Sequence, residues 1–112
     1  MKSVQDVSII VSNYNSSDLI NGALESIVST AGDVSFDVII IDDASIDGGF
    51  ALVDEKYKRD QRFIFIQCEK HVGYSALNVA LNRTRGKYLM TLETAARLWP
   101  GALQALETFR EE

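Results

Sequence analysis

Residues 38–49 read VIIIDDASIDGG, an unbroken apolar run that ends in two aspartates and a turn-forming segment. A continuous rather than alternating apolar run is typical of a strand that is covered on both faces, as in a parallel sheet. Polar residues directly after such a strand lie at its carboxyl end, which is where open α/β sheets bind their ligands. This stretch therefore predicts both a buried strand and a candidate binding site at its end.

The rest of the chain alternates between short apolar runs and segments with helical spacing. Runs rich in β-branched and aromatic residues predict three further strands, at residues 7–11, 63–66 and 88–92. Apolar residues at three- and four-residue intervals predict helices at 19–28, 50–57 and 76–81, and a fourth helix that begins at Pro100. Gly86 is expected to close the third helix. This alternation predicts an α/β fold: a Rossmann-like, open, mainly parallel sheet with helices on both faces.

Size and composition narrow the class of protein. A length of 112 residues predicts a single domain over residues 1–112, and 46% hydrophobic with 24% charged residues is an ordinary globular composition. The net charge of -5 argues against nucleic-acid binding, which requires a basic surface. No apolar run reaches the roughly 18 residues of a membrane span, and Cys68 is the single cysteine. We expect a soluble, cytoplasmic domain with no nucleic-acid partner.

The residues that follow the predicted strands favour a nucleotide ligand but do not identify which nucleotide. The chain lacks both GxGxxG after its first strand and GxxxxGK[ST] anywhere, so it lacks the common dinucleotide and P-loop motifs. Asp42 and Asp43 can accept hydrogen bonds from a ribose or a base, or one of them can cap the following turn. Tyr14 can stack on a base, and the Asn13 and Asn15 side chains can hold the loop or a ligand.

Four segments in order carry a resemblance to a known family. They are VSIIVSNYN (7–15), VIIIDDASIDGG (38–49), HVGYSALNVALNRTRGKYLMTLE (71–93) and LWPGALQAL (98–106). Together they resemble the nucleotide-binding half of a family 2 glycosyltransferase of the GT-A fold. The branch that includes rhamnosyl- and galactofuranosyltransferases looks closest.

The resemblance implies a UDP- or dTDP-linked sugar donor and transfer of the sugar to an acceptor hydroxyl. Asp43 would accept the base N–H, with Asp42 as its neighbour, and Ser12 and Tyr14 would lie against the ribose and base. The segment from Gly73 to Asn78 would run near the diphosphate. The implied donor-binding residues are Ser12, Tyr14, Asp42, Asp43, Gly73 and Asn78.

The chain departs from the family pattern at the expected metal position. The family holds Mg²⁺ or Mn²⁺ with an acidic motif after the fourth strand, but residues 93–95 here read Glu-Thr-Ala. Ala95 replaces the expected aspartate, and a methyl group cannot ligate a metal. Glu93 is the remaining candidate ligand, or else an exposed residue at a strand end.

Two expectations concern the part of the family fold that follows the donor-binding half. That part holds the acceptor site and the catalytic base, and it is expected to lie beyond Glu112, so no catalytic residue is assigned and the 112-residue chain is expected to be catalytically incomplete. A non-catalytic binding or interaction module is the alternative. The strand at 88–92 is expected to leave an open edge through which the chain forms a homo-oligomer.

Overall fold

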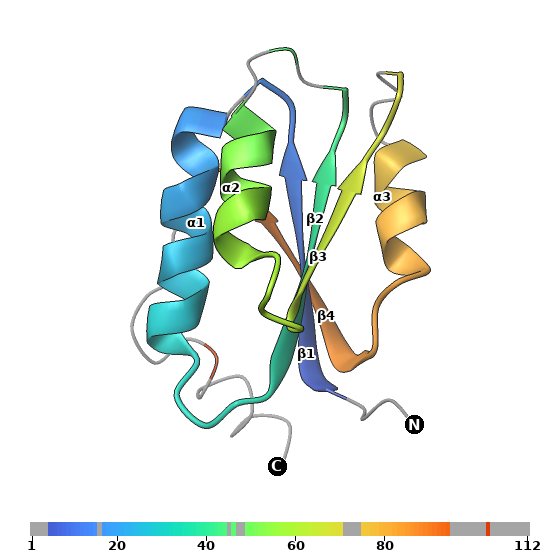
Figure 1. The fold of residues 1–112 in the computed structure, drawn as a ribbon. Helices are drawn as coiled ribbons and strands as arrows, with labels where there is room; N and C mark the ends of the chain where they lie inside the picture. Colours follow the sequence, from blue (N-terminus) through green and yellow to red (C-terminus); the bar gives the residue numbers. More distant parts are fainter. Residues whose placement is uncertain are drawn as a thin grey trace.

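The computed structural model describes residues 5–15, 17–44, 46, 49–70, 75–94 and 103. Strands and helices alternate along the chain (Figure 1): β1 (Gln5–Asn13), α1 (Ser17–Thr30), β2 (Phe36–Asp42), α2 (Gly49–Tyr57), β3 (Phe63–Gln67), α3 (Ser75–Leu81) and β4 (Gly86–Glu93). The four predicted strands and the first three predicted helices are confirmed. The helix expected after Pro100 lies outside the described residues, except for Leu103, which is helical and buried.

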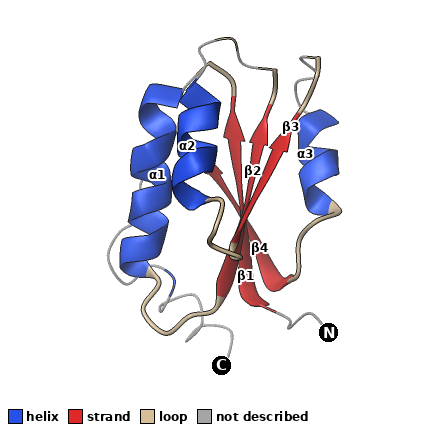
Figure 2. Cartoon of the chain, viewed as in Figure 1, coloured by secondary structure: helices blue, strands red, loops and turns tan. Residues whose placement is uncertain are grey.

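The four strands form one parallel sheet in the order β3-β2-β1-β4. Helices α1 and α2 cover one face, and α3 covers the other (Figure 2). The predicted Rossmann-like α/β fold is therefore confirmed. The chain moves outward from β1 to β2 and β3 and then crosses back beyond β1, so the direction of winding reverses between β1 and β4. Open α/β sheets bind ligands outside the carboxyl ends of strands at such a reversal.

Apolar side chains on both faces of the sheet build the core. Every residue of β2 is buried, as its unbroken apolar run predicts. Alternate residues of β1 and β2 contribute to a large cluster under α1 and α2, and the remaining apolar positions join a smaller cluster under α3. The buried members of the smaller cluster are Ile10, Ile39, Ile41 and Ala80. Covering both faces of the central strands in this way makes them rigid supports for the loops that follow them.

The sequence predicts that Gly86 closes α3. In the structure Gly86 instead begins β4. Helix α3 ends at Leu81, and a turn follows in which the Arg83 N–H donates to the Ala80 carbonyl at 2.9 Å. The glycine is needed because β4 comes very close to β1 here. A Cβ on Gly86 would lie 2.7 Å from the carbonyl carbon of Val7, closer than real Cβ contacts allow, and it would also overlap the Ser8 nitrogen.

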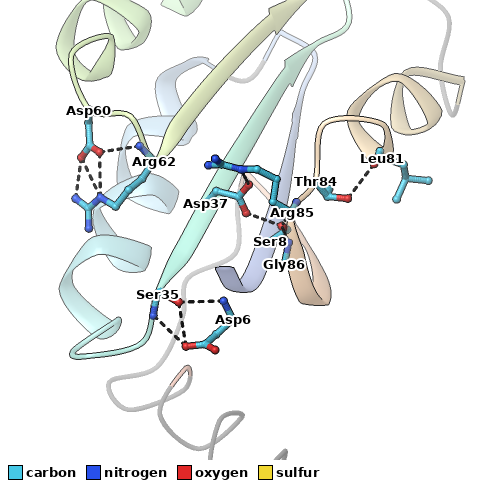
Figure 3. A network of polar contacts seen from close by, with 10 residues as sticks. All are labelled: Asp6, Ser8, Ser35, Asp37, Asp60, Arg62, Leu81, Thr84, Arg85 and Gly86. Carbon is cyan, nitrogen blue, oxygen red and sulfur yellow. Dashed lines mark hydrogen bonds and ion pairs between the residues drawn. The ribbon is translucent and has the colours of Figure 1, made fainter. Parts of the chain in front are cut away.

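A buried polar network fastens three strands where they begin, at what we call the amino edge of the sheet (Figure 3). Ser8 and Asp37 are register partners on β1 and β2, and both are fully buried. The Ser8 hydroxyl donates to Asp37 Oδ1 at 2.5 Å and accepts from the backbone N–H groups of Gly86 at 2.6 Å and Arg85 at 3.1 Å. Arg85 Nε lies 3.4 Å from Asp37 Oδ2, so a cation balances the buried carboxylate.

A second ion pair lies in the turn that leads into β3, also at the amino edge (Figure 3). Arg62 Nη2 lies 2.7 Å from Asp60 Oδ2, and the guanidinium stacks 4.7 Å from the centre of the Phe36 ring. Hydrogen bonds from the Arg62 side chain and backbone hold the pKa of Asp60 below its ordinary value, against the opposing effect of partial burial. This pair is more exposed than the Ser8–Asp37 network.

Candidate functional site

The opposite end of the sheet, which we call the carboxyl edge, holds four of the six predicted donor-binding residues. Ser12 lies on β1 and Asp42 on β2, with Tyr14 and Asp43 directly after these strands. Ser12 is also the register partner of Glu93 on β4, and both side chains are exposed. The side chains therefore gather at the ends of three adjacent strands, on either side of the reversal in winding.

Of the two remaining predicted donor-binding residues, the structure describes one. Asn78 is on α3 with an exposed side chain. Gly73 and Ala95 lie outside the described residues. The structure thus describes the nucleoside side of the expected site better than its diphosphate and metal side.

A buried hydrogen bond joins the ends of β1 and β2. Asn13 and Asp42 are register partners without exposed surface, and Asn13 Nδ2 donates to Asp42 Oδ1 at 2.7 Å. The next residue, Asp43, donates its N–H to the Asn13 carbonyl at 2.9 Å, and Cys68 donates its N–H to the Asp42 carbonyl at 2.8 Å. Asp42 therefore ties three strand ends together. Asn13 holds the loop, which is one of the two roles that the sequence leaves open.

Tyr14 and Asp43 present complementary surfaces at this edge. The Tyr14 side chain is 49% exposed, whereas Asp43 is only 7% exposed. An aromatic ring offers a flat apolar face on which a base can stack, and a carboxylate accepts hydrogen bonds with both oxygens. A planar heterocycle with an N–H donor on its edge has the chemistry to interact with both kinds of group.

The loops after β1 and β2 contain Asn15, which the sequence singles out, and Ala44 and Ile46, which it does not. Asn15 and Ala44 have positive φ angles of 51° and 63°. Asn15 Oδ1 accepts the N–H of Ile46 at 2.8 Å, so Asn15 also holds a loop. Asparagine adopts this left-handed conformation readily, but nothing in the identity of Ala44 or Ile46 indicates their place in the loop, because alanine ordinarily avoids it.

Cys68 is partly buried beside the same edge, where it packs against the smaller apolar cluster. Burial raises the pKa of its thiol, and the negative charges of Asp43 and Asp42 raise it further. The reactive form of cysteine is the thiolate, and a raised pKa disfavours that form at neutral pH. Cys68 acts as a packing residue.

The described residues do not provide a complete metal site. Among them, no three His, Cys, Asp or Glu side chains come together in a way that could hold an ion. Glu93 alone occupies the strand end where the family pattern places its acidic motif, and Mg²⁺ requires near-octahedral oxygen ligands. The donor set in the described part of the chain therefore does not fit the expected Mg²⁺ or Mn²⁺.

None of the described helices has the length and apolar character needed to cross a membrane.

Comparisons with known proteins agree with the fold. Residues 8–106 match the family described as Glycosyl transferase family 2. Chondroitin synthase from Escherichia coli is 36% identical over 115 residues, an alignment that covers 100% of this chain and 16% of that protein. The curated relatives are much longer than this chain, which spans 35% or less of their length.

Two solved structures are similar over most of the chain. Staphylococcus aureus TarS 1-349, solved in complex with UDP, superposes with a TM-score of 0.83 at 26% identity and covers 95% of this chain and 32% of that one. The mannosyltransferase PcManGT from Pyrobaculum calidifontis, solved with GDP-Man and Mn²⁺, superposes with a TM-score of 0.75 at 26% identity. That alignment covers 89% of this chain and 30% of the mannosyltransferase.

Proposed function

The chain belongs to glycosyl transferase family 2, and from that premise we propose that its carboxyl edge binds the nucleotide of a UDP- or dTDP-linked sugar whose glycosyl group is transferred to an acceptor hydroxyl. The nearly buried Asp43 beside the half-exposed Tyr14 is the observation that supports this most directly. UDP in TarS and GDP-Man in the mannosyltransferase are nucleotides of the same chemical class. The rhamnosyl- or galactofuranosyltransferase branch and the cytoplasmic location stay predictions.

In this proposal each described residue has a distinct task. Asp43 accepts the N3–H that uracil and thymine share, and Tyr14 stacks on the base. Ser12 lies against the ribose. Asp42 keeps Asn13 and the strand ends in place and does not contact the ligand directly, because it is fully buried in its bond to Asn13. Gly73 and Asn78 are proposed for the diphosphate on the basis of the family resemblance.

We further propose that the 112-residue chain by itself transfers no sugar. Ala95 occupies the position where the family pattern places a metal-ligating aspartate, and a methyl group cannot ligate a metal. Residues that bind the donor without this ligand would hold it but not activate it. Sugar transfer from UDP- or dTDP-sugars by the purified chain would contradict this and would also remove the alternative of a non-catalytic module.

Calorimetric titration with UDP and dTDP tests the binding proposal. Asp43→Asn replaces one accepting oxygen with a donor, so we expect affinity to fall by roughly tenfold or more, as for a lost hydrogen bond to a charged group. Asp33→Asn is the matched control, because Asp33 is exposed in the turn between α1 and β2. Unchanged affinity in Asp43→Asn, or no binding by the wild-type chain, would refute the assignment.

A second proposal concerns self-association through the outer edge of β4, which is the last strand of the sheet in the described part of the chain. Tyr88 and Leu89 are 37% and 50% exposed there. We propose that a second copy pairs antiparallel with β4 about Met90. This register sets Lys87 of each copy opposite Glu93 of the other on one face of the new sheet, which gives two complementary charge pairs.

Sedimentation equilibrium at tens of micromolar tests this pairing, and we expect a dimer. Lys87→Glu should weaken the dimer because it places like charges opposite each other, and the double variant Lys87→Glu with Glu93→Lys should restore it. Lys70→Glu, an exposed charge reversal away from β4, is the control. A monomeric wild-type chain would rule the pairing out.

A further inference from the structure

The loops that follow β1 and β2 are joined to each other at two points. Close to the sheet, the Asp43 N–H donates to the Asn13 carbonyl at 2.9 Å. Farther along both loops, the Ile46 N–H donates to Asn15 Oδ1 at 2.8 Å. Tyr14 lies between the two bonded residues of the first loop. The residues proposed to contact the base are therefore bracketed by two hydrogen bonds between the loops.

The second bond holds a loop whose backbone is in a disfavoured conformation. Ala44, with φ 63°, lies between Asp43 and the bonded Ile46. Residues with a side chain rarely adopt this region, and they persist in it only where their surroundings constrain them. The Ile46 side chain is 90% exposed, so apolar burial contributes little to holding the end of this segment. The hydrogen bond that the Ile46 N–H donates to Asn15 Oδ1 constrains this segment.

Asn15 is well suited to this task because of its own backbone. Its φ of 51° lies in the left-handed region, and asparagine tolerates this conformation better than most residues with a side chain. Its side-chain oxygen then reaches the Ile46 N–H across 31 residues of sequence. One residue thus both shapes the first loop and anchors the second.

We propose that Asn15 is a positioning residue of the donor site, which sets Tyr14 and Asp43 in their binding arrangement before the nucleotide arrives. This inference rests on the proposed function of the carboxyl edge. A ligand that meets an ordered loop does not have to order it, so the contact raises affinity without touching the ligand. Asn15 acts through the loop on the nucleoside, and its loss changes affinity more than stability.

Two substitutions at residue 15 separate the hydrogen bond from the backbone conformation. Asn15→Gly keeps the positive φ but removes the acceptor oxygen, and we expect the affinity for uridine and UDP to fall roughly three- to tenfold. Asn15→Asp keeps an acceptor oxygen and tolerates the same φ, so uridine affinity should return to near the wild-type value. Uridine is the critical probe, because it carries no phosphate for the new carboxylate to repel.

A third variant removes the donor of the same hydrogen bond, and a second measurement follows that donor N–H directly. Ile46→Pro removes the donor N–H while Asn15 stays in place, and it should weaken uridine binding as Asn15→Gly does. Amide hydrogen exchange by NMR should show the Ile46 N–H protected in the wild-type chain and in Asn15→Asp, and unprotected in Asn15→Gly. Calorimetry is performed well below the thermal midpoint of each variant so that all of them are folded.

The outcomes distinguish this inference from the function on which it rests. If the wild-type chain binds uridine and Asn15→Gly binds it equally well, Asn15 has no positioning role. If Asn15→Asp is as weak toward uridine as Asn15→Gly, the hydrogen bond is not the cause, and the proposal is again overturned. A wild-type chain that binds neither uridine nor UDP overturns the proposed function itself and this inference with it.

Discussion

The two ends of the β1–β2 pair contain the same kind of bond in very different settings. Ser8 and Asp37 at the amino edge are buried register partners joined by a side-chain hydrogen bond. Asn13 and Asp42 at the carboxyl edge, five residues farther along each strand, are joined in the same way. Each pair links a carboxylate of β2 to an uncharged polar residue of β1.

The difference lies in what surrounds each carboxylate. At the amino edge, Arg85 and the N–H of Gly86 complete a network that joins β4 to β1 and β2. At the carboxyl edge, the pair is followed by loops with exposed side chains and two left-handed residues. A buried polar pair can therefore hold strands together at one end of a sheet and support a binding surface at the other.

The largest effect is expected from Asp37→Ala. Removing one partner of a buried ion pair leaves the other uncompensated, and because Arg85 is partly exposed we expect a loss of about 3 kcal/mol in the free energy of unfolding. Urea unfolding measures this, with Asp33→Ala as an exposed control. Below its unfolding transition the variant should still bind UDP like the wild type. Weakened UDP binding by the folded variant would show that the two edges are not independent.

A smaller effect, of opposite sign, is expected from Ala44→Gly. Glycine adopts a φ of 63° without the steric penalty that alanine carries, so the chain should become more stable by about 1 kcal/mol. The freer loop should at the same time bind UDP more weakly. Gly32→Ala reverses the substitution at a positive φ of 57° in the turn before β2, and it should destabilise the chain and leave binding unchanged. Tighter UDP binding by Ala44→Gly would contradict a preset loop.

The smallest effect concerns pH and the Asp60–Arg62 pair at the amino edge. Because the pKa of Asp60 is lower in the folded chain than its ordinary value of 3.8, the pair stabilises the fold above that pH, and its contribution is lost as the pH falls through the folded pKa. Asp60→Asn should therefore cost less than about 1 kcal/mol near neutral pH. The free energies of unfolding of the wild-type chain and of Asp60→Asn, measured with urea, should become equal in acid. A difference that persists below the folded pKa would have another cause.

The strands and the order of elements could be predicted because apolar runs report directly on burial. The run at 38–41 predicts a strand covered on both faces, and β2 is buried throughout. The same reasoning places the candidate site, because Asp42 and Asp43 follow that run. Local patterns were sufficient for these predictions because burial and strand ends are properties of a single segment.

The rest depends on contacts between segments, which a single pattern does not reveal. The sequence suggests a helix end at Gly86, because glycine commonly occupies that place. The glycine is needed for another reason: β1 comes very close to it at Ser8, which is 78 residues away in the sequence. Asp37 precedes the apolar run and resembles an ordinary surface carboxylate until Arg85 and Ser8 come beside it. The hydrogen bond from the Ile46 N–H to Asn15 Oδ1 likewise exists only once two loops have met.

The equal spacing of the two polar pairs has a consequence for how β1 finds its partner. Both strands are apolar on both faces, so sliding one past the other by a residue would still set isoleucine and valine against isoleucine and valine. The same slide would separate both bonded pairs, and it would bury the carboxylate of Asp37 against Val7 or Ile9, neither of which can donate to it. The alignment of the two strands is therefore decided by polar residues that contribute little to their hydrophobicity.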